Sequence, residues 1–341
     1  MAKQDIIVIG ASAEGVDALS NLVKSLPADF PGSVFVTLHI PPYATSALPD
    51  ILTAAGPLKA VHPKDGDKMK PGYIYVASPD RHLLMDHDQV LVKNGPKENR
   101  FRPSVDALFR SAAYIYGVRV VGVVLSGAMD DGTSGLWTIK QLGGVSIVQD
   151  PEEATFADMP LNAIEQSDVD YVKRTAEIGP LLATLVKEPL TRQPVLSEKD
   201  RKRLEIEIAI AAPDLAFHRG IMEMGEVVPY TCPDCHGALV RLREGRISRF
   251  RCHTGHSFTA SALLSGISEA IEKTLWEGMR GLEENTMLLN ELGAQFSQDG
   301  QPEVAELFNQ KAKETEKRAR VVHNAVLQHQ NLSESIRREK A

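Results

Sequence analysis

Three kinds of side chain that together carry out acyl transfer lie at the ends of aliphatic runs in this sequence. They are a hydroxyl, an imidazole and a carboxylate, supplied by Ser12, His39 and the adjacent pair Asp130 and Asp131. In acyl transfer the imidazole accepts the proton of the attacking hydroxyl, and the carboxylate orients the imidazole and stabilises its charged form. This chemistry requires the three groups to meet, so the elements that carry them must end at one place.

The aliphatic runs predict strands of a parallel sheet. Residues 6–9, 34–40 and 118–125 are nearly continuous in aliphatic side chains, which is typical of strands buried on both faces. Apolar periodicity over residues 16–26 and 133–142 predicts helices after the first and third strands. The expected fold class is α/β, a doubly wound and mostly parallel sheet whose strands share one carboxyl edge.

Each of these residues also has a simpler interpretation. Ser12 could cap the following helix, His39 could be half-buried without a role, and the two aspartates could stabilise a helix N-terminus by about 1 kcal/mol. The turn at Ser12 matches neither the dinucleotide motif, which needs glycine there, nor the phosphate loop, which needs Gly-Lys-Ser/Thr. Glu14 breaks the Gly-x-Ser-x-Gly hydrolase elbow. Because the required residue types occur at three separate strand ends, we favour acyl transfer.

The remaining elements of this domain are predicted from shorter patterns. Residues 58–92 predict a β-rich insertion with hairpins, because short apolar runs alternate with turn residues. Its predicted strands are residues 59–62, 73–77, 83–85 and 90–92. Helices are predicted over residues 103–116, 161–166 and 176–185, and strands over residues 145–149 and 170–173.

A second group of chemistry-bearing residues follows much later in the chain. Two cysteines form one ligand pair, a cysteine and a histidine form another, and a β-hairpin over residues 238–250 separates them. This arrangement is typical of a zinc ribbon, since zinc takes four thiolate or imidazole ligands in a tetrahedron. We assign the ligands to Cys232, Cys235, Cys252 and His256, with His253 as the competing fourth ligand. A closed set of four ligands implies a structural zinc, and buried free thiols are the alternative.

Arginines alternate along this hairpin and make it locally basic. They are Arg241, Arg243, Arg246, Arg249 and Arg251. Such alternation is more typical of a solvated face than of a nucleic-acid site, and the net charge of the whole chain is −7. We therefore expect solvent-exposed arginines and no nucleic-acid partner.

From residue 262 onward, apolar residues recur at helical spacing in two segments, which predicts an antiparallel helical hairpin. The pattern leaves open whether this hairpin packs on the first domain, mediates self-association or binds a partner. The expected domains are therefore a catalytic-type domain (1–188), a linker with a short helix (189–228), the zinc ribbon (229–260) and the hairpin tail (261–341).

The composition limits where this protein works. The N-terminus lacks a signal-peptide pattern, and no stretch approaches the ~18 apolar residues of a membrane span. All three cysteines lie between positions 232 and 252, which does not indicate a disulfide framework. We expect a cytoplasmic protein with no direct membrane insertion.

Six stretches of the first domain, in the same order, resemble the catalytic domain of the chemotaxis protein-glutamate methylesterases. They are Ile9-Gly10-Ala11-Ser12, Leu38-His39-Ile40-Pro41-Pro42, Gly72-Tyr73-Ile74-Tyr75-Val76-Ala77, Arg102-Pro103-Ser104-Val105-Asp106-Ala107-Leu108-Phe109, Leu125-Ser126-Gly127 through Asp131-Gly132, and Gln149-Asp150 with Met159-Pro160-Leu161-Asn162-Ala163-Ile164. The resemblance covers about residues 4–188, and it implies a doubly wound sheet that carries a Ser–His–Asp triad.

The resemblance also implies roles for individual residues. Ser12 would be the nucleophile, His39 the base and Asp131 the orienting acid, because the family's aspartate directly precedes a glycine. The backbone N–H groups of Ala13 and Ala128 would hold the oxyanion, and no cofactor would take part in catalysis. The implied reaction hydrolyses γ-methyl esters of glutamates in a methylated chemoreceptor or other signalling protein, and the same site could deamidate glutamine.

The sequence departs from the family pattern in two turns. The family's Ser-Thr-Gly-Gly is here Ser12-Ala13-Glu14-Gly15, and its Thr-Gly-Met-Gly is here Ser126-Gly127-Ala128-Met129. Glu14 brings a carboxylate near the site, and the family's receiver domain is not expected because the sheet begins within ten residues of the start. These departures motivate an alternative, a non-catalytic scaffold that binds receptors or kinases through the esterase-like cleft and the zinc–helix tail.

Overall fold

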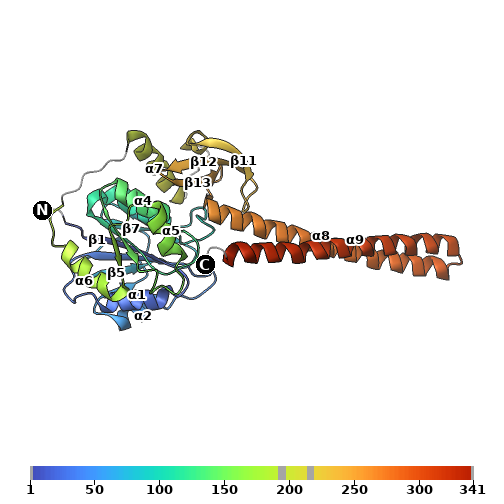
Figure 1. Ribbon diagram of the computed structural model, residues 1–341, viewed down its shortest axis with the longest axis horizontal. Coiled ribbons are helices and arrows are strands. Elements are labelled where there is room, and N and C mark those ends of the chain that lie inside the picture. The colour runs from blue at the N-terminus through green and yellow to red at the C-terminus, as the bar shows by residue number, and fades with distance from the viewer. Residues whose placement is uncertain (1–2, 191–196, 213–218, 339–341) are drawn as a thin grey trace. The chain divides into compact units, whose positions relative to one another are not determined.

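The structure of this protein is a computed structural model that describes residues 3–190, 197–212 and 219–338, with side chains described as far as residue 329. The chain divides into two compact units, Met1–Leu263 and Leu264–Ala341. The first unit holds the described strands, and two long helices make up the second (Figure 1).

The central sheet of the first unit has seven strands in the order β10-β9-β8-β1-β2-β5-β3. The strands are β1 (Ile6–Ala11), β2 (Ser33–Leu38), β3 (Lys59–Val61), β5 (Tyr73–Val76), β8 (Val120–Val124), β9 (Val145–Gln149) and β10 (Tyr171–Lys173). All neighbouring pairs in this sheet are parallel. Strands β1, β2, β8 and β9 are buried along their whole length, which explains their aliphatic runs. The predicted α/β class with a mostly parallel sheet is confirmed.

Helices cover both faces of this sheet. They are α1 (Gly15–Lys24), α2 (Leu48–Ala55), α3 (Val105–Tyr116), α4 (Thr133–Gln141), α5 (Asp158–Gln166) and α6 (Thr175–Leu185), with a short 3-10 turn, η1 (Gly117–Arg119), after α3. Alternate residues of β1 point to opposite faces. Ile7 and Ile9 pack with side chains of α1, α2 and α6, whereas Ile6 and Val8 pack with side chains of α3, α4 and α5.

The predicted β-rich insertion is only partly a set of hairpins. Strands β6 (His82–Asp86) and β7 (Gln89–Lys93) form a hairpin, and β4 (Asp67–Lys68) pairs with β7 in the same small antiparallel sheet. The prediction was wrong for β3 and β5, which join the central sheet as parallel strands. They do so because their apolar residues, among them Ala60 and Ile74, are buried in the core beside β2.

The first unit continues with α7 (Glu198–Ala211), the 3-10 turn η3 (Ile221–Glu223) and a four-stranded antiparallel sheet in the order β11-β12-β13-β14. These strands are β11 (Glu226–Thr231), β12 (Ala238–Glu244), β13 (Ile247–Cys252) and β14 (Ser257–Thr259). We call residues 226–259 the ribbon. Parts of the predicted linker, residues 191–196 and 213–218, lie outside the described residues. The division into residues 1–188, 189–228 and 229–260 stays a prediction.

The ribbon arginines do not form the solvent-exposed face that their alternation predicts. Arg243 and Arg246 are exposed, but Arg249 and Arg251 are fully buried. Both buried guanidinium groups pair with buried glutamates. The alternation of arginines along a strand cannot predict these ion pairs, because the glutamate partners lie on other elements.

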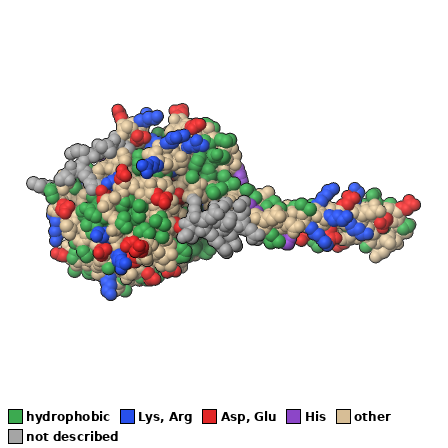
Figure 2. Space-filling model, in the orientation of Figure 1, with side chains coloured by type: hydrophobic (Ala, Val, Ile, Leu, Met, Phe, Trp, Pro, Cys, Tyr) green, Lys and Arg blue, Asp and Glu red, His purple; other side chains and the backbone are tan. Residues whose placement is uncertain are grey.

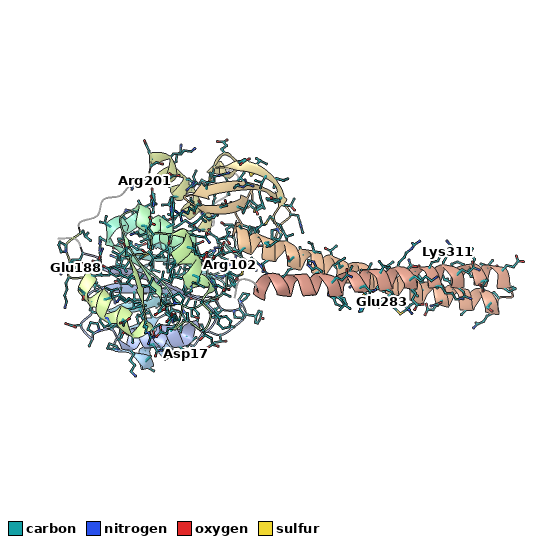
Figure 3. The ribbon with its side chains drawn as sticks, in the orientation of Figure 1. Asp17, Arg102, Glu188, Arg201, Glu283 and Lys311 are labelled. Carbon is teal, nitrogen blue, oxygen red and sulfur yellow. The ribbon has the colours of Figure 1, made fainter. Side chains whose placement is uncertain are left out.

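The second unit is the predicted helical hairpin. Helices α8 (Ala260–Gln298) and α9 (Pro302–Arg338) run antiparallel, so Phe296 stacks on Phe308 near the turn and His329 Nε2 lies 2.9 Å from the carbonyl oxygen of Ser268. Charged side chains of both signs are interspersed along the hairpin (Figure 2), and many side chains extend away from it (Figure 3). Across the described part of the chain, we find no helix whose length and apolarity would suit a membrane span.

Candidate active site and metal centre

Ser12 lies on a tight turn between β1 and α1. The turn is held by two main-chain hydrogen bonds, from the Ser12 N–H to the Ser126 carbonyl (2.9 Å) and from the Gly15 N–H to the Ser12 carbonyl (2.9 Å). Glu14 precedes the helix in the left-handed conformation, with φ 56°, and no side chain caps the helix. The Ser12 hydroxyl is therefore not used as a cap and is half-buried beside a cleft.

His39 follows the end of β2 and contacts both other members of the expected triad. Its Nδ1 lies 3.1 Å from Ser12 Oγ, and its Nε2 lies 2.7 Å from Asp131 Oδ2. We assign the proton to Nε2, because the carboxylate can only accept a hydrogen bond from it. Nδ1 is then free to accept the proton of the serine hydroxyl.

Asp131 is buried at the amino end of α3 and accepts hydrogen bonds from five groups. They are His39 Nε2 and the Val105 N–H to Oδ2, and Asn99 Nδ2, Ser104 Oγ and the Asp106 N–H to Oδ1. Burial raises the pKa of the Asp131 carboxyl, but His39 and the other donors outweigh burial and lower this pKa to about 2. The amino end of a helix also favours negative charge, so Asp131 is an anion at neutral pH.

The neighbouring Asp130 points elsewhere. Its Oδ1 accepts from Thr259 Oγ1 at 2.7 Å and its Oδ2 from Ser261 Oγ at 2.5 Å. Of the two aspartates that the sequence offers, Asp131 is the one hydrogen-bonded to the imidazole. The following helix α4 has Gly132 at its N-cap and no side-chain cap, so neither aspartate caps α4. Asp131 instead accepts main-chain N–H groups at the amino end of α3.

The loop after β8, which carries the second expected oxyanion donor, Ala128, packs against the turn at Ser12. A side chain at Gly127 would come within 2.7 Å of Ser12 Cβ, so the two turns are in direct contact. The N–H groups of Gly127 and Met129 donate to Phe156 and Asp158, respectively. Within the described residues, the N–H groups of Ala13 and Ala128 have no hydrogen-bond acceptor.

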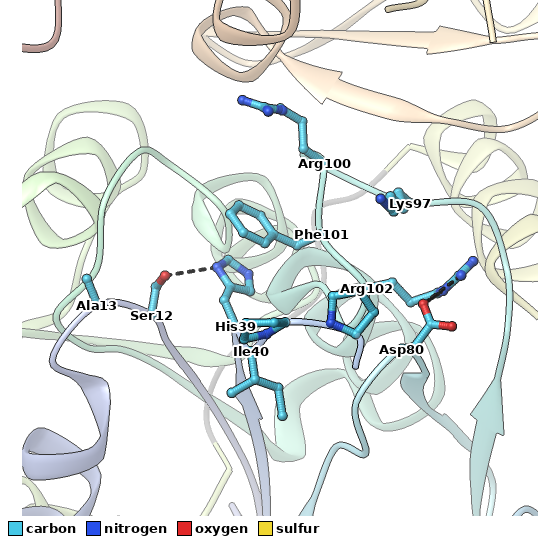
Figure 4. A pocket seen from close by; sticks show the side chains of 11 residues that line it. Ser12, Ala13, His39, Ile40, Asp80, Lys97, Arg100, Phe101 and Arg102 are labelled. Carbon is cyan, nitrogen blue, oxygen red and sulfur yellow. Dashed lines mark hydrogen bonds and ion pairs between the residues drawn. The ribbon is translucent and has the colours of Figure 1, made fainter. Parts of the chain in front are cut away.

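The cleft beside Ser12 has a volume of about 390 Å³ and a mixed lining (Figure 4). Besides Ser12, Ala13 and His39, its lining residues are Ile40, Pro41, Pro42, Asp80, Lys97, Arg100, Phe101 and Arg102. The Phe101 ring stacks on the His39 imidazole, with centroids 3.8 Å apart and planes within 5° of parallel. Arg102 is bound to Asp80 through both Nε and Nη2.

Sequence reasoning assigned no role to Asn99 or Phe101, although both contact triad residues. The one feature of the sequence that could have pointed to Asn99 and Phe101 is their position just before the Arg102-Pro103-Ser104 stretch, which carries part of the family resemblance. Glu14, by contrast, was expected near the site but lines a separate hollow with Asp17 and Glu153. The carboxylate that motivated a non-catalytic scaffold is therefore outside the lining of the Ser12 cleft.

The four assigned zinc ligands come together in the ribbon. The Sγ atoms of Cys232, Cys235 and Cys252 and a ring nitrogen of His256 all lie within 4.8 Å of one another. The Sγ atoms of Cys235 and Cys252 are 3.7 Å apart. A tetrahedral zinc with Zn–S bonds of ~2.3 Å would place its sulfur ligands about 3.8 Å apart, so the donor set fits this metal. His253 is not part of the cluster, and its ring packs against Gly237.

Comparisons with known proteins match the part of the chain that carries this site. The sequence model of the CheB methylesterase family matches residues 7–182, which is more than half of the chain. The chain therefore belongs to the CheB methylesterase family. It is an enzyme of the protein-glutamate methylesterase class, and these enzymes are carboxylic ester hydrolases.

Individual relatives support the same assignment. A "Putative protein-glutamate methylesterase/protein-glutamine glutaminase" of Leptospira interrogans is 37% identical over 182 residues, which cover 53% of this chain and 94% of the relative. A protein-glutamate methylesterase/protein-glutamine glutaminase of Photorhabdus laumondii is 36% identical over 50% of each chain. The crystal structure of the Thermotoga maritima CheB methylesterase catalytic domain superposes with a TM-score of 0.52 at 34% identity, covering 55% of this chain and all of that one. The ribbon and the helical hairpin lie outside the residues that the family model matches.

Proposed function

We propose that this chain is a serine esterase that removes methyl esters from glutamate side chains of a chemoreceptor-like signalling protein in the cytoplasm. The observation that carries the proposal is the continuous contact from Ser12 Oγ through His39 to Asp131, with distances of 3.1 and 2.7 Å. Three segments of the chain contribute to this contact, and it lies beside a cleft that holds about 390 Å³.

In the proposed reaction, His39 Nδ1 takes the proton of Ser12 as Oγ attacks the ester carbonyl carbon. The resulting imidazolium keeps its Nε2 proton, which points at the Asp131 anion. In a chymotrypsin-type triad, Nε2 of the histidine faces the serine and Nδ1 faces the aspartate. In this protein the two ring nitrogens of His39 have the opposite partners. Either nitrogen of a neutral imidazole can act as the base, so the exchange leaves the chemistry intact.

The developing oxyanion would be bound by the N–H groups of Ala13 and Ala128. Their lack of other acceptors in the described residues supports this role. One such donor contributes about 10²–10³ in rate. His39 then protonates the departing methoxide, methanol leaves, and a water deprotonated by His39 hydrolyses the acyl-enzyme to release the glutamate carboxylate. The same steps on a glutamine side chain would release ammonia.

The decisive experiment measures methanol released from a methylated chemoreceptor preparation. Ser12→Ala should reduce the rate by about 10⁴-fold or more, because the nucleophile is lost. Ser20→Ala is the matched control, since Ser20 lies on α1 and, among the residues described, its hydroxyl bonds only to the Val16 carbonyl. A serine-directed fluorophosphonate should label Ser12 in the wild-type protein. No methanol release from any methylated receptor, together with no labelling of Ser12, would refute the proposal.

We also propose that Cys232, Cys235, Cys252 and His256 hold one structural zinc ion. A closed set of four protein ligands leaves no position for a substrate, so the metal would stabilise the ribbon and take no part in ester hydrolysis. Metal analysis should find about one zinc per chain, lost in Cys252→Ser but retained in His253→Ala. Equal zinc content in all three proteins would contradict this ligand set.

Self-association through the α8–α9 hairpin stays a prediction. Large apolar side chains such as Trp276, Met287 and Val321 are exposed on it, and sedimentation at several concentrations would test whether they pair.

A further inference from the structure

A short segment of the chain connects the ribbon to the triad. We call residues 97–102 the bridging segment. The Ser257 N–H donates to the Lys97 carbonyl at 3.2 Å, and the Asn99 N–H donates to the Ser257 carbonyl at 2.7 Å. The first residue of β14 is thus paired with the bridging segment by main-chain hydrogen bonds on both sides of Glu98.

Asn99 in this segment uses its whole amide group between the ribbon and the triad. Its Nδ2 donates to Asp131 Oδ1 at 2.8 Å and to Asp106 Oδ2 at 2.9 Å, and its Oδ1 accepts from the Thr259 N–H at 2.9 Å. A main-chain N–H can only donate, so the acceptor end of the amide must face Thr259. The donor end therefore faces the two carboxylates. The hydrogen bond from Thr259, in the last strand of the ribbon, therefore orients the Asn99 amide so that its NH2 group faces the Asp131 carboxylate.

The bridging segment also holds the imidazole. Phe101, two residues after Asn99, stacks on the His39 ring at 3.8 Å. One segment tied to the ribbon therefore contacts both the base and the orienting acid of the triad.

The chain leaving the ribbon holds the residue that directly precedes the triad acid. Thr259 Oγ1 and Ser261 Oγ donate to the two carboxylate oxygens of Asp130, the residue directly before Asp131. Asp130 is 6% exposed and Thr259 is 2% exposed, so the hydrogen bond between them is largely shielded from water.

A buried group of charges keeps the ribbon in this position. It consists of three arginines and three glutamates, which are Arg110, Arg249, Arg251, Glu98, Glu207 and Glu244, and we call it the charge cluster. Arg251 Nη2 lies 2.8 Å from Glu98 Oε1, and Arg249 lies 2.7 Å from Glu244 and 2.8 Å from Glu207. Glu98 also pairs with Arg110 of α3. The cluster joins β12 and β13 of the ribbon to α3, α7 and the bridging segment next to Asn99.

From these contacts we infer that the ribbon is a working part of the esterase site, in which residues 257–261 hold Asp131 through Asn99 and Asp130. Asn99 and Thr259 are positioning residues, since neither lines the cleft. The inference rests on the proposed triad, and it assigns to the ribbon a role beyond its own folding.

The test compares Asn99→Ala and Thr259→Val with the wild-type full-length protein in the methanol-release assay. We expect kcat of Asn99→Ala to fall about 10–100-fold, the range found when a partner that orients a metal ligand is removed. KM should stay within about twofold, because Asn99 does not line the cleft. Thr259→Val removes the hydroxyl that donates to Asp130 and accepts from the Ala262 N–H. It should give a smaller fall in kcat, which Thr259→Ser should restore because serine keeps that hydroxyl.

Two further measurements separate positioning from loss of structure. Thr138→Val is the matched control, because Thr138 is similarly buried and, within the described residues, its hydroxyl bonds only to the Ser134 carbonyl of α4. It should leave kcat unchanged. The rate of fluorophosphonate labelling at Ser12 requires the triad but no receptor, and it should fall in parallel with kcat.

The outcomes are distinct. The inference is wrong if both variants keep kcat and labelling rates within about twofold of wild type, if only KM changes, or if Thr259→Ser behaves like Thr259→Val. Should Asn99→Ala fail to fold, the Thr259 pair decides the matter alone. If the wild-type protein itself neither releases methanol nor is labelled at Ser12, the proposed function fails, and the positioning role falls with it.

Discussion

The triad and the charge cluster both bury charged groups, but they compensate the charges differently. In the charge cluster, three arginines face three glutamates, so the formal charges cancel. Asp131 is held mainly by neutral N–H and O–H donors, which stabilise its charge without cancelling it. A carboxylate that keeps its net charge can stabilise an imidazolium beside it, whereas a neutralised one mainly holds elements together. The comparison predicts catalytic effects at the first site and stability effects at the second.

The largest expected effect comes from removing the charge of the triad acid. Asp131→Asn should lower kcat by about 10⁴-fold, because the amide would no longer hold the imidazole in the productive tautomer. Methanol release measures this effect. Asp130→Asn is the control, since Asp130 contacts Thr259 and Ser261 rather than His39, and its loss should be far smaller. Equal losses in the two variants would show that the geometry does not separate the two aspartates.

The charge cluster should respond in stability. Arg249→Met would leave Glu207 and Glu244 short of a partner in a fully buried place. Breaking a buried pair in this way typically costs about 3–5 kcal/mol. Urea unfolding of the full-length protein measures the change. Arg246→Met, on the exposed turn of the same hairpin, should stay within about 0.5 kcal/mol of wild type, and a similar loss in both would contradict the distinction.

The depressed pKa of Asp131 predicts a pH-dependent part of the stability. Folding lowers this pKa from 3.8 to about 2, so the stabilisation is present above pH ~4 and is lost as the pH falls towards 2. Its size is about 2 kcal/mol. Unfolding free energies of wild type and Asp131→Asn, measured from pH 5 to 2, should converge by this amount. Parallel curves would mean that Asp131 is not held as an anion.

The smallest effect concerns the turn that presents Ser12. Glu14 has φ 56°, a conformation that costs a residue with a side chain roughly 1 kcal/mol. Glu14→Gly should therefore stabilise the protein by up to about 1 kcal/mol with little change in kcat, because Glu14 does not line the cleft. Thermal unfolding and methanol release check both parts. Glu152→Gly, at an exposed position outside the left-handed region, should instead have no stabilising effect.

Much of the fold could be predicted because the signals are local. The aliphatic runs before Ser12, His39 and Asp131 report burial on both faces, and burial on both faces requires a parallel sheet covered by helices. The spacing of Cys232 and Cys235, and of Cys252 and His256, likewise predicts a cluster of metal ligands. Strands β3 and β5 were placed wrongly because such short patterns do not distinguish a hairpin strand from a strand of the central sheet.

The residue types and their order along the chain determined the class of fold, the edge of the sheet that carries the chemistry and the set of groups available there. Only the tertiary structure decided that Nδ1 faces the serine, and that Asn99 and two ribbon arginines are buried with partners more than 25 residues away. The physical reason is that the periodicity of apolar residues depends only on whether each residue faces solvent or the core. It contains no information about which distant donor will hydrogen-bond to a buried acceptor once the segments pack together.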